Sequence, residues 1–279
     1  MEEAQETQKK AMFNRTTEED AKPVYIECRV PRGVLIGGKD DEPGRVLNIV
    51  QLREMSGHEE DLLVTETIDI TTRLNRIIGN CIVSVSDGEY TIDDRTSINR
   101  MMTTHPDGFT LSDAMVLMFK LREVTVGDEF RQTITCPKCT DEEGVPYSWT
   151  HVGSFSDIEV QPCKGDVSEP VRNFVTSRGN VIEWEMMTAA KDAEYSRKKM
   201  IKNKATRALM MRVSKINDHK ATVERLQDLP MTERTEIKKQ FDQEGGMDMD
   251  IAFVCRNCEH EFTVPINIGA KGFFRHLED

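Results

Sequence analysis

The sequence predicts an α+β fold built from two similar repeats of helices and strands, related by internal duplication and joined through a split zinc ribbon. Two observations predict this fold. The same order of strand-like and helix-like segments occurs twice along the 279 residues, as expected when a long repeat constrains the order of elements. Two Cys-x-x-Cys pairs, Cys136 with Cys139 and Cys255 with Cys258, stand at corresponding places near the end of each half.

Strand patterns open the first half. Residues 24–30 and 45–52 are strand-like, and the turn-rich segment 37–44 lies between them. Ser56 followed by Glu59 is typical of a capping box, in which a hydroxyl and a carboxylate satisfy free amides at a helix start. This pattern predicts a helix that begins near residue 57.

Further helices are predicted where apolar residues recur three or four positions apart. The three sets are Leu74, Ile77, Ile78 and Cys81; Ile98, Met101 and Met102; and Leu111, Ala114, Met115, Met118 and Leu121. Thr110 or Ser112 is the expected cap of the last helix. After Gly127 the period changes to two, and the resulting strand leads into the first cysteine pair.

The second half repeats this order. The corresponding segments are 180–195 with 45–62, 205–218 with 73–87, and 230–241 with 110–121. Thr188 falls on Ser56 in this comparison, but Lys191 replaces Glu59, so we expect a weaker helix cap in the second copy. Beyond the second cysteine pair, Phe273 corresponds to Phe155.

These patterns predict four regions along the chain. Residues 1–22 lack a periodic apolar pattern and are expected to form an N-terminal arm that is disordered or ordered only by a partner. The first repeat spans residues 23–160 and carries Cys136 and Cys139. A linker covers residues 161–172, and the second repeat spans residues 173–279 with Cys255 and Cys258.

The net charge of −12 bears on the choice of partner. Duplex DNA and anionic membranes both require a basic face, so nucleic acid is disfavoured as a partner and no membrane partner is expected. No apolar run reaches the roughly 20 residues that span a bilayer, and the first residues lack the apolar stretch of a signal peptide. We therefore expect the protein to fold in a cytoplasm, where paired cysteines favour metal over disulfides.

The two cysteine pairs predict one structural zinc ion. Tetrahedral zinc takes four ligands, with sulfur at about 2.3 Å, and each pair supplies two of them. His260, two residues after Cys258, has an awkward reach to the same ion, and His151 could reach it but has no counterpart in the second half. The simplest closure uses Cys136, Cys139, Cys255 and Cys258 on a single ion. Separate disulfides, a redox-active pair, and two sites completed by a partner chain remain alternatives at this point.

Motifs for catalysis or cofactor binding are absent from the sequence. It contains no G-x-S-x-G elbow, P-loop, H-E-x-x-H or G-x-G-x-x-G motif. The segment 58–61, His-Glu-Glu-Asp, has the residue types of a catalytic cluster. Acids in the first turn of a helix also complement its dipole, and this is the preferred interpretation. We expect a non-enzymatic protein with no catalytic residues, no organic cofactor and no small-molecule substrate.

Four segments carry a resemblance to a known family. They are LREMSGHEEDLL at 52–63, EWEMMTAAKDAEY at 183–195, ITCPKC at 134–139, and FVCRNCEHEFTVPINIGAKGFF at 253–274. Together they resemble baseplate hub and tail-assembly proteins of contractile-tailed bacteriophages, over about residues 24–275. The second copy departs from the pattern, because Ala189 and Lys191 stand where the first copy has Gly57 and Glu59.

The resemblance implies a structural or assembly component of the baseplate hub. Its expected partners are other tail proteins of the hub, tube or tape measure, and its expected location is the virion baseplate or the host cytoplasm during assembly. Two other classes stay open. A zinc-ribbon accessory protein of packaging or transcription would bind nucleic acid through its knuckle tips, where Lys138 and Arg256 are surrounded by acids. A Cys-x-x-Cys thiol oxidoreductase would need a helix after the first cysteine.

Overall fold

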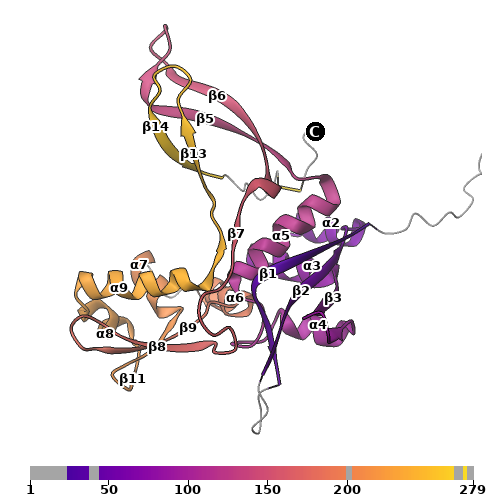
Figure 1. Cartoon of the computed structure of the whole chain (residues 1–279), viewed down its shortest axis with the longest axis vertical. Helices are drawn as coiled ribbons and strands as arrows, with labels where there is room; N and C mark the ends of the chain where they lie inside the picture. Colours follow the sequence, from indigo (N-terminus) through magenta and orange to yellow (C-terminus); the bar gives the residue numbers. More distant parts are fainter. Residues whose placement is uncertain (1–23, 38–43, 199–202, 267–272, 275–279) are drawn as a thin grey trace, which may run out of the picture.

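The computed structural model describes residues 24–37, 44–198, 203–266 and 273–274. The predicted N-terminal arm lies outside these residues. Figure 1 shows two units of helices and strands beside each other, and an arm of two β-hairpins that projects away from them. The fold is therefore mixed α and β with several small antiparallel sheets, as the α+β prediction requires.

The first unit contains a four-stranded antiparallel sheet in the order β1-β2-β3-β4. Its strands are β1 (Tyr25–Ile36), β2 (Arg45–Arg53), β3 (Ile82–Ser86) and β4 (Thr91–Ile92). Strand β1 runs further than predicted, because its ladder with β2 accommodates an irregularity between Arg29 and Val34. Gly33 allows this irregularity, since its φ is +88° and a Cβ there would overlap the carbonyl of Leu47.

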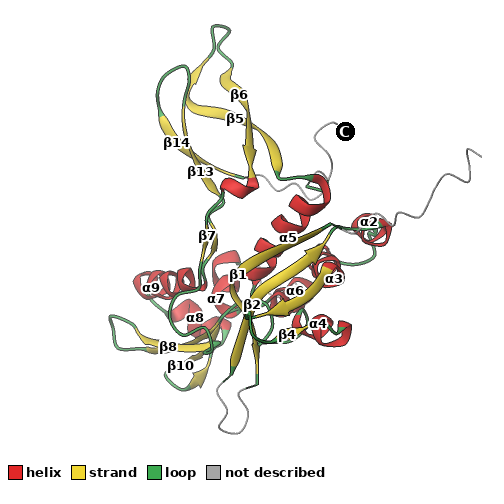
Figure 2. Ribbon diagram, turned by 45° about the vertical axis from the view of Figure 1, so that its right-hand side comes forward, coloured by secondary structure: helices red, strands yellow, loops and turns green. Residues whose placement is uncertain are grey.

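Helices cover the sheet of the first unit. They are α2 (Gly57–Val64), α3 (Ile70–Cys81), α4 (Arg95–Met101) and α5 (Leu111–Val126), which confirms the four predicted helices. Ser56 and Glu59 form the predicted capping box of α2, and Thr110 is the N-cap of α5. Figure 2 shows α3 and α5 lying behind the strands β1 and β2. Between them lies a core that includes Leu47, Val50, Ile77, Val85 and Leu117.

The second unit has the same order of elements as the first. Its sheet, in the order β8-β9-β10-β11, contains β8 (Val171–Val175), β9 (Val181–Glu185), β10 (Val213–Ile216) and β11 (His219–Lys220). Its helices are α6 (Ala189–Lys198), α7 (Lys204–Met210), α8 (Val223–Asp228) and α9 (Met231–Phe241). In both units two strands precede two helices, followed by two strands and two helices. The second unit has its own apolar core, with Ile182, Leu209, Leu226 and Ile237 fully buried.

The helix cap at Thr188 differs from the sequence-based expectation. Thr188 is 0% exposed, and its hydroxyl accepts a hydrogen bond from the Lys191 backbone N–H at 3.2 Å. The cap therefore survives without an acid at position 191. The Lys191 side chain instead bonds Glu185 at 2.7 Å, so its charge is satisfied on the neighbouring strand.

The two units are joined at the start of α5 and α6. Thr110 and Thr188 form an isolated antiparallel bridge, and the Leu111 N–H donates to the Met187 carbonyl at 2.6 Å. The segment predicted as a linker also packs between the units. Its strand β7 (Val160–Gln161) pairs with β12 (Gly246–Met247), and the Cys163 N–H donates to the Pro31 carbonyl at 3.0 Å.

The structure also contains two short 3-10 helices, η1 (Phe155–Asp157) and η2 (Asp242–Glu244). They follow the last strand of one arm hairpin and the last helix of the second unit, respectively. Within the described part of the chain, no helix is both long and apolar enough to cross a membrane.

Candidate metal centre

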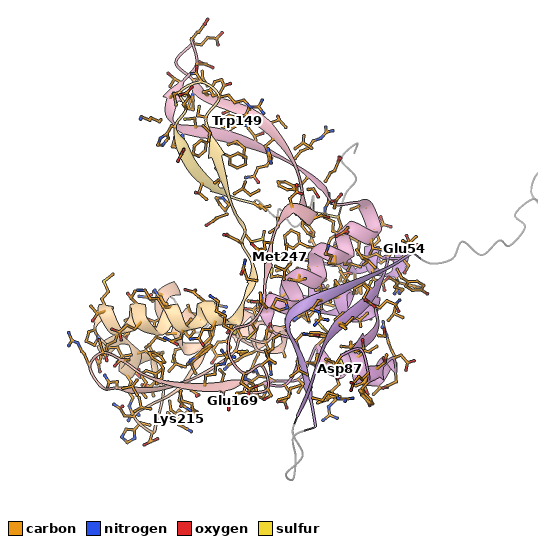
Figure 3. All side chains as sticks on the ribbon, viewed as in Figure 1. Glu54, Asp87, Trp149, Glu169, Lys215 and Met247 are labelled. Carbon is orange, nitrogen blue, oxygen red and sulfur yellow. The ribbon has the colours of Figure 1, made fainter. Side chains whose placement is uncertain are left out.

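The arm consists of two hairpins that come from opposite halves of the chain. The first pairs β5 (Glu129–Thr140) with β6 (Pro146–Ser154), and the second pairs β13 (Asp250–Val254) with β14 (Glu261–Pro265). Aromatic side chains fill the space between them: the ring of Trp149 lies 6.3 Å from that of Phe253 and 6.1 Å from that of Phe262. Figure 3 places Trp149 well inside the arm and Met247 near its base.

The first cysteine pair lies in a bulge of β5. The ladder with β6 jumps from the pair Thr135–Ser148 to the pair Thr140–Pro146, so the residues from Cys136 to Cys139 leave the regular strand. The Lys138 backbone N–H donates to Cys136 Sγ at 3.4 Å. This bend turns the chain back on itself and brings both thiols to the same side.

The second cysteine pair follows β13 in a tight turn. The Cys255 N–H donates to the His260 carbonyl at 2.9 Å, and the Glu259 N–H donates to the Cys255 carbonyl at 3.0 Å. Glu259 closes the turn with a positive φ of 56°. The Asn257 N–H donates to Cys255 Sγ at 3.4 Å, as the Lys138 N–H does in the first pair, so the two turns hold their leading sulfur in the same way.

The four thiols meet between the hairpin ends. Cys136 Sγ lies 3.8 Å from Cys258 Sγ, and Cys139 Sγ lies 3.6 Å from Cys255 Sγ. All four sulfur atoms lie within 4.8 Å of one another. In a tetrahedron with bonds of about 2.3 Å, neighbouring sulfurs are about 3.8 Å apart. The cluster therefore has a geometry that could hold a metal ion.

Backbone and side-chain donors surround the sulfur atoms. Desolvation raises the pKa of Cys255, but N–H groups of Asn257 and Cys258 and the neighbouring thiols outweigh it and lower this pKa to about 7. Desolvation and a hydrogen bond with Cys258 raise the pKa of Cys139 to about 12. The Asn257 side chain donates across the gap to Cys139 Sγ at 3.6 Å, which ties one hairpin to the other. A metal ion would replace the thiol protons that this cluster shares.

The histidines near the pairs lie outside the cluster. The His151 ring packs 4.9 Å from that of Phe253, and the His260 ring stacks on Phe262 at 6.1 Å. All seven cysteines lie within the described residues and are free thiols. Cys81 is buried in the core of the first unit, as its helical spacing predicts.

The segment 58–61 does not assemble a cluster. Its Glu59 side chain is buried and bonds Arg53 at 3.0 Å and the Ser56 backbone N–H at 2.9 Å, whereas His58, Glu60 and Asp61 are exposed. Burial opposes ionisation of Glu59, but these hydrogen bonds outweigh it and lower its pKa to about 2. The acid therefore caps α2 and anchors it to β2.

Sequence reasoning missed a polar cluster at the junction of the units. His105 Nε2 lies 2.7 Å from Glu185, and its Nδ1 lies 2.9 Å from the Thr188 hydroxyl. The hydrogen bond from His105 lowers the pKa of Glu185 to about 2, and Lys191 also lowers it. Together they outweigh burial, which raises this pKa. Hydroxyl, imidazole and carboxylate also line up in nucleophilic active sites. Here the hydroxyl is fully buried, so the cluster serves to join the two units.

No spacing in the sequence signals this cluster, because His105 lies 80 residues from Glu185 and neither belongs to a recognisable motif.

In comparisons with known proteins, no protein-family model matches the chain, and no curated protein or solved structure matches it either.

Proposed function

We propose that Cys136, Cys139, Cys255 and Cys258 bind one structural zinc ion, and that the chain is a non-enzymatic assembly component of a contractile phage tail, at the baseplate hub. The observation that carries the metal proposal is the meeting of two cysteine pairs from hairpins far apart in the chain, with sulfur spacings of 3.6 and 3.8 Å. Four thiolates favour zinc and leave no open coordination position, so the ion would stabilise structure.

We also propose that the chain arose by internal duplication, with the zinc ion at the meeting point of the two copies. The repeated order of strands and helices in the two units supports this proposal. So does the placement of each cysteine pair after the last helix of its unit, within a hairpin. In a split ribbon of this kind, each copy contributes one hairpin of the arm.

The phage assignment rests on the resemblance, and the segments that carry it occupy structural positions. Residues 52–63 span the end of β2 and the capped start of α2, and residues 183–195 span the corresponding part of β9 and α6. The other two segments contain the cysteine pairs. These positions suit a scaffold that acts through its surfaces, in the virion baseplate or in the host cytoplasm during assembly.

The test is co-expression of the tagged chain with hub, tube and tape-measure proteins of a contractile-tailed phage. We expect a stable complex with at least one of them and one equivalent of zinc in the purified chain. Absence of any complex would contradict the assembly role. Tight binding of duplex DNA at low salt, through Lys138 and Arg256, would instead favour the nucleic-acid class. Reversible thiol oxidation with reduction of insulin disulfides would favour the oxidoreductase class.

A further inference from the structure

Strand β6 has a free edge whose backbone groups point away from its partner. One position beyond the end of the ladder with β5, the Phe155 N–H donates to the Asp128 carbonyl at 2.9 Å. Asp128 and Phe155 continue the register of β5 with β6, and their bond makes them a hydrogen-bonded pair. Hydrogen-bonded and non-hydrogen-bonded pairs alternate along such a ladder. In the register of β5 with β6, the N–H and C=O groups of Ser148, Thr150 and Val152 therefore face outward. Among the described residues, β6 pairs with β5 alone.

The side chains of these residues are exposed as well. Ser148, Thr150 and Val152 alternate with the half-buried Trp149 and His151, and Val152 is 52% exposed. The inward side chains pack on the second hairpin, as the contact of His151 with Phe253 shows. The packing holds β6 extended, so its outer edge is a preformed template for another strand.

Other sheet edges in the described part of the chain carry the features that normally prevent strand pairing, which are charge, proline or shortness. β4, β7, β11 and β12 have two residues each. β1, β5, β8 and β13 include charged residues, and β14 has both Glu261 and Pro265. In contrast, β6 is nine residues long and contains no Asp, Glu, Lys or Arg. Its one proline, Pro146, is the first residue of the strand and lies outside residues 148–152.

Acidic residues lie at both ends of β6. The exposed turn before it contains Asp141, Glu142 and Glu143, and the exposed acids after it are Asp157 and Glu159. Antiparallel pairing with a second copy of β6 would bring the acidic turn of each copy toward the acidic end of the other. Like charges that face each other destabilise strand pairs, so a second copy is a poor occupant. A strand with basic residues at its ends complements both flanks.

We infer that the β6 edge, residues 148–152, binds an extended segment of a partner protein by strand addition, and that this segment has an uncharged β-branched centre with Lys or Arg at both ends. The inference rests on the proposed assembly role, because it identifies where on the arm that role is exercised. Backbone hydrogen bonds would supply the attachment, and the acidic flanks would select the charge of the partner.

The probe is a fluorescein-labelled peptide, KKTVTVTKK, titrated with the zinc-loaded full chain. The test variant is Thr150→Pro. It removes an outward N–H but no hydrogen bond of the ladder with β5, and proline is tolerated at such positions of an edge strand. The control is Thr133→Pro, because Thr133 lies directly opposite Thr150 in the ladder and its N–H faces the other edge. We expect Thr150→Pro to weaken binding roughly tenfold or more, and Thr133→Pro to leave the Kd unchanged.

Two further measurements sharpen the result. Melting temperature and zinc content establish that each variant is folded; if Thr150→Pro unfolds, Val152→Lys replaces it, with Val254→Lys on β13 as control. A peptide with glutamates in place of lysines should bind far more weakly, and the difference should shrink at high salt. Absence of peptide binding, equal losses in test and control variants, or Thr150-dependent dimerisation of the chain would each overturn the inference. A tail-protein complex that survives Thr150→Pro would overturn it while leaving the proposed function intact.

Discussion

Cys139 Sγ lies 3.6 Å from Cys255 Sγ, although 116 positions separate the two residues in the chain. The contact joins hairpins that belong to different halves of the sequence. A cross-link restricts the unfolded chain more when the loop that it closes is longer. A metal ion at this point would therefore stabilise the arm by cross-linking hairpins from the two halves of the chain.

Substitution of either cysteine pair should release the same metal ion. We expect one equivalent of zinc in the purified chain, and loss of that zinc in both Cys136→Ser and Cys255→Ser, with a similar fall in melting temperature. The reason is that structural zinc binding contributes directly to folding free energy. The control is Cys163→Ser, because Cys163 is a free thiol outside the cluster. Two equivalents of zinc per chain, or metal retained by Cys255→Ser, would contradict a shared site.

Loss of the Thr188 cap should destabilise the protein more than loss of the Ser56 cap, whereas sequence comparison predicts the opposite order. Ser56→Ala should lower the free energy of unfolding by about 1 kcal/mol, the usual value for a cap. Thr188→Ala should cost more, about 2 kcal/mol, because it also leaves half-buried partners of the hydroxyl unsatisfied, including the His105 ring at 2.9 Å. Urea unfolding of both variants measures the difference. A smaller loss for Thr188→Ala would restore the sequence-based order.

Glu244 should make the protein less stable as the pH rises toward neutrality. Burial of its carboxyl raises the pKa of Glu244 to about 7, and the negative charge of Asp113 adds to this rise. Three groups oppose the rise: Arg212 at 3.0 Å, the Met187 N–H that donates to the carboxylate, and the charge of Arg172. A raised folded pKa favours the protonated acid. The stabilisation is therefore complete below the ordinary value of 4.5 and is lost as the pH passes through about 7.

Glu244→Gln tests this dependence, since it keeps an acceptor for the Met187 N–H but cannot ionise. Relative to this variant, the wild-type chain should lose about 3 kcal/mol of unfolding free energy between pH 4.5 and pH 8. Urea unfolding at several pH values gives the two profiles. Glu143→Gln, on the exposed turn of the arm, should run parallel to the wild type. Parallel profiles for Glu244→Gln as well would show that burial does not control this carboxyl.

Deletion of residues 1–22 should impair assembly with tail partners while leaving the melting temperature and the zinc content nearly unchanged. The segment is charged and aperiodic, so it cannot bury a core alone, and a partner must offset the entropy lost on ordering it. Thermal unfolding, metal analysis and co-purification measure the three quantities. Normal assembly of the truncated chain would exclude a role for residues 1–22, and unfolding would show that the first repeat begins before residue 23.

Signals that act over a few residues were readable in the sequence. The box of Ser56 with Glu59, the Thr110 cap and the apolar spacing of α3, α4 and α5 each depend on neighbours within about one helical turn. The alternation before each cysteine pair likewise predicted the strands β5 and β13. These elements are correct because local backbone preferences and tertiary packing favour the same structure at these positions.

Relations between distant residues were decided only by the tertiary structure. Sequence spacing left one shared metal site, two sites and disulfides all possible, and only the packing of the two hairpins brings the sulfur atoms together. The same holds for His105 with Glu185, for the buried Thr188, and for the segment 161–172, which packs between the units. The outward edge of β6 depends on which strands are its neighbours. The physical reason is that these contacts are set by how whole elements dock, and that docking sums many weak interactions that no short pattern of residues encodes.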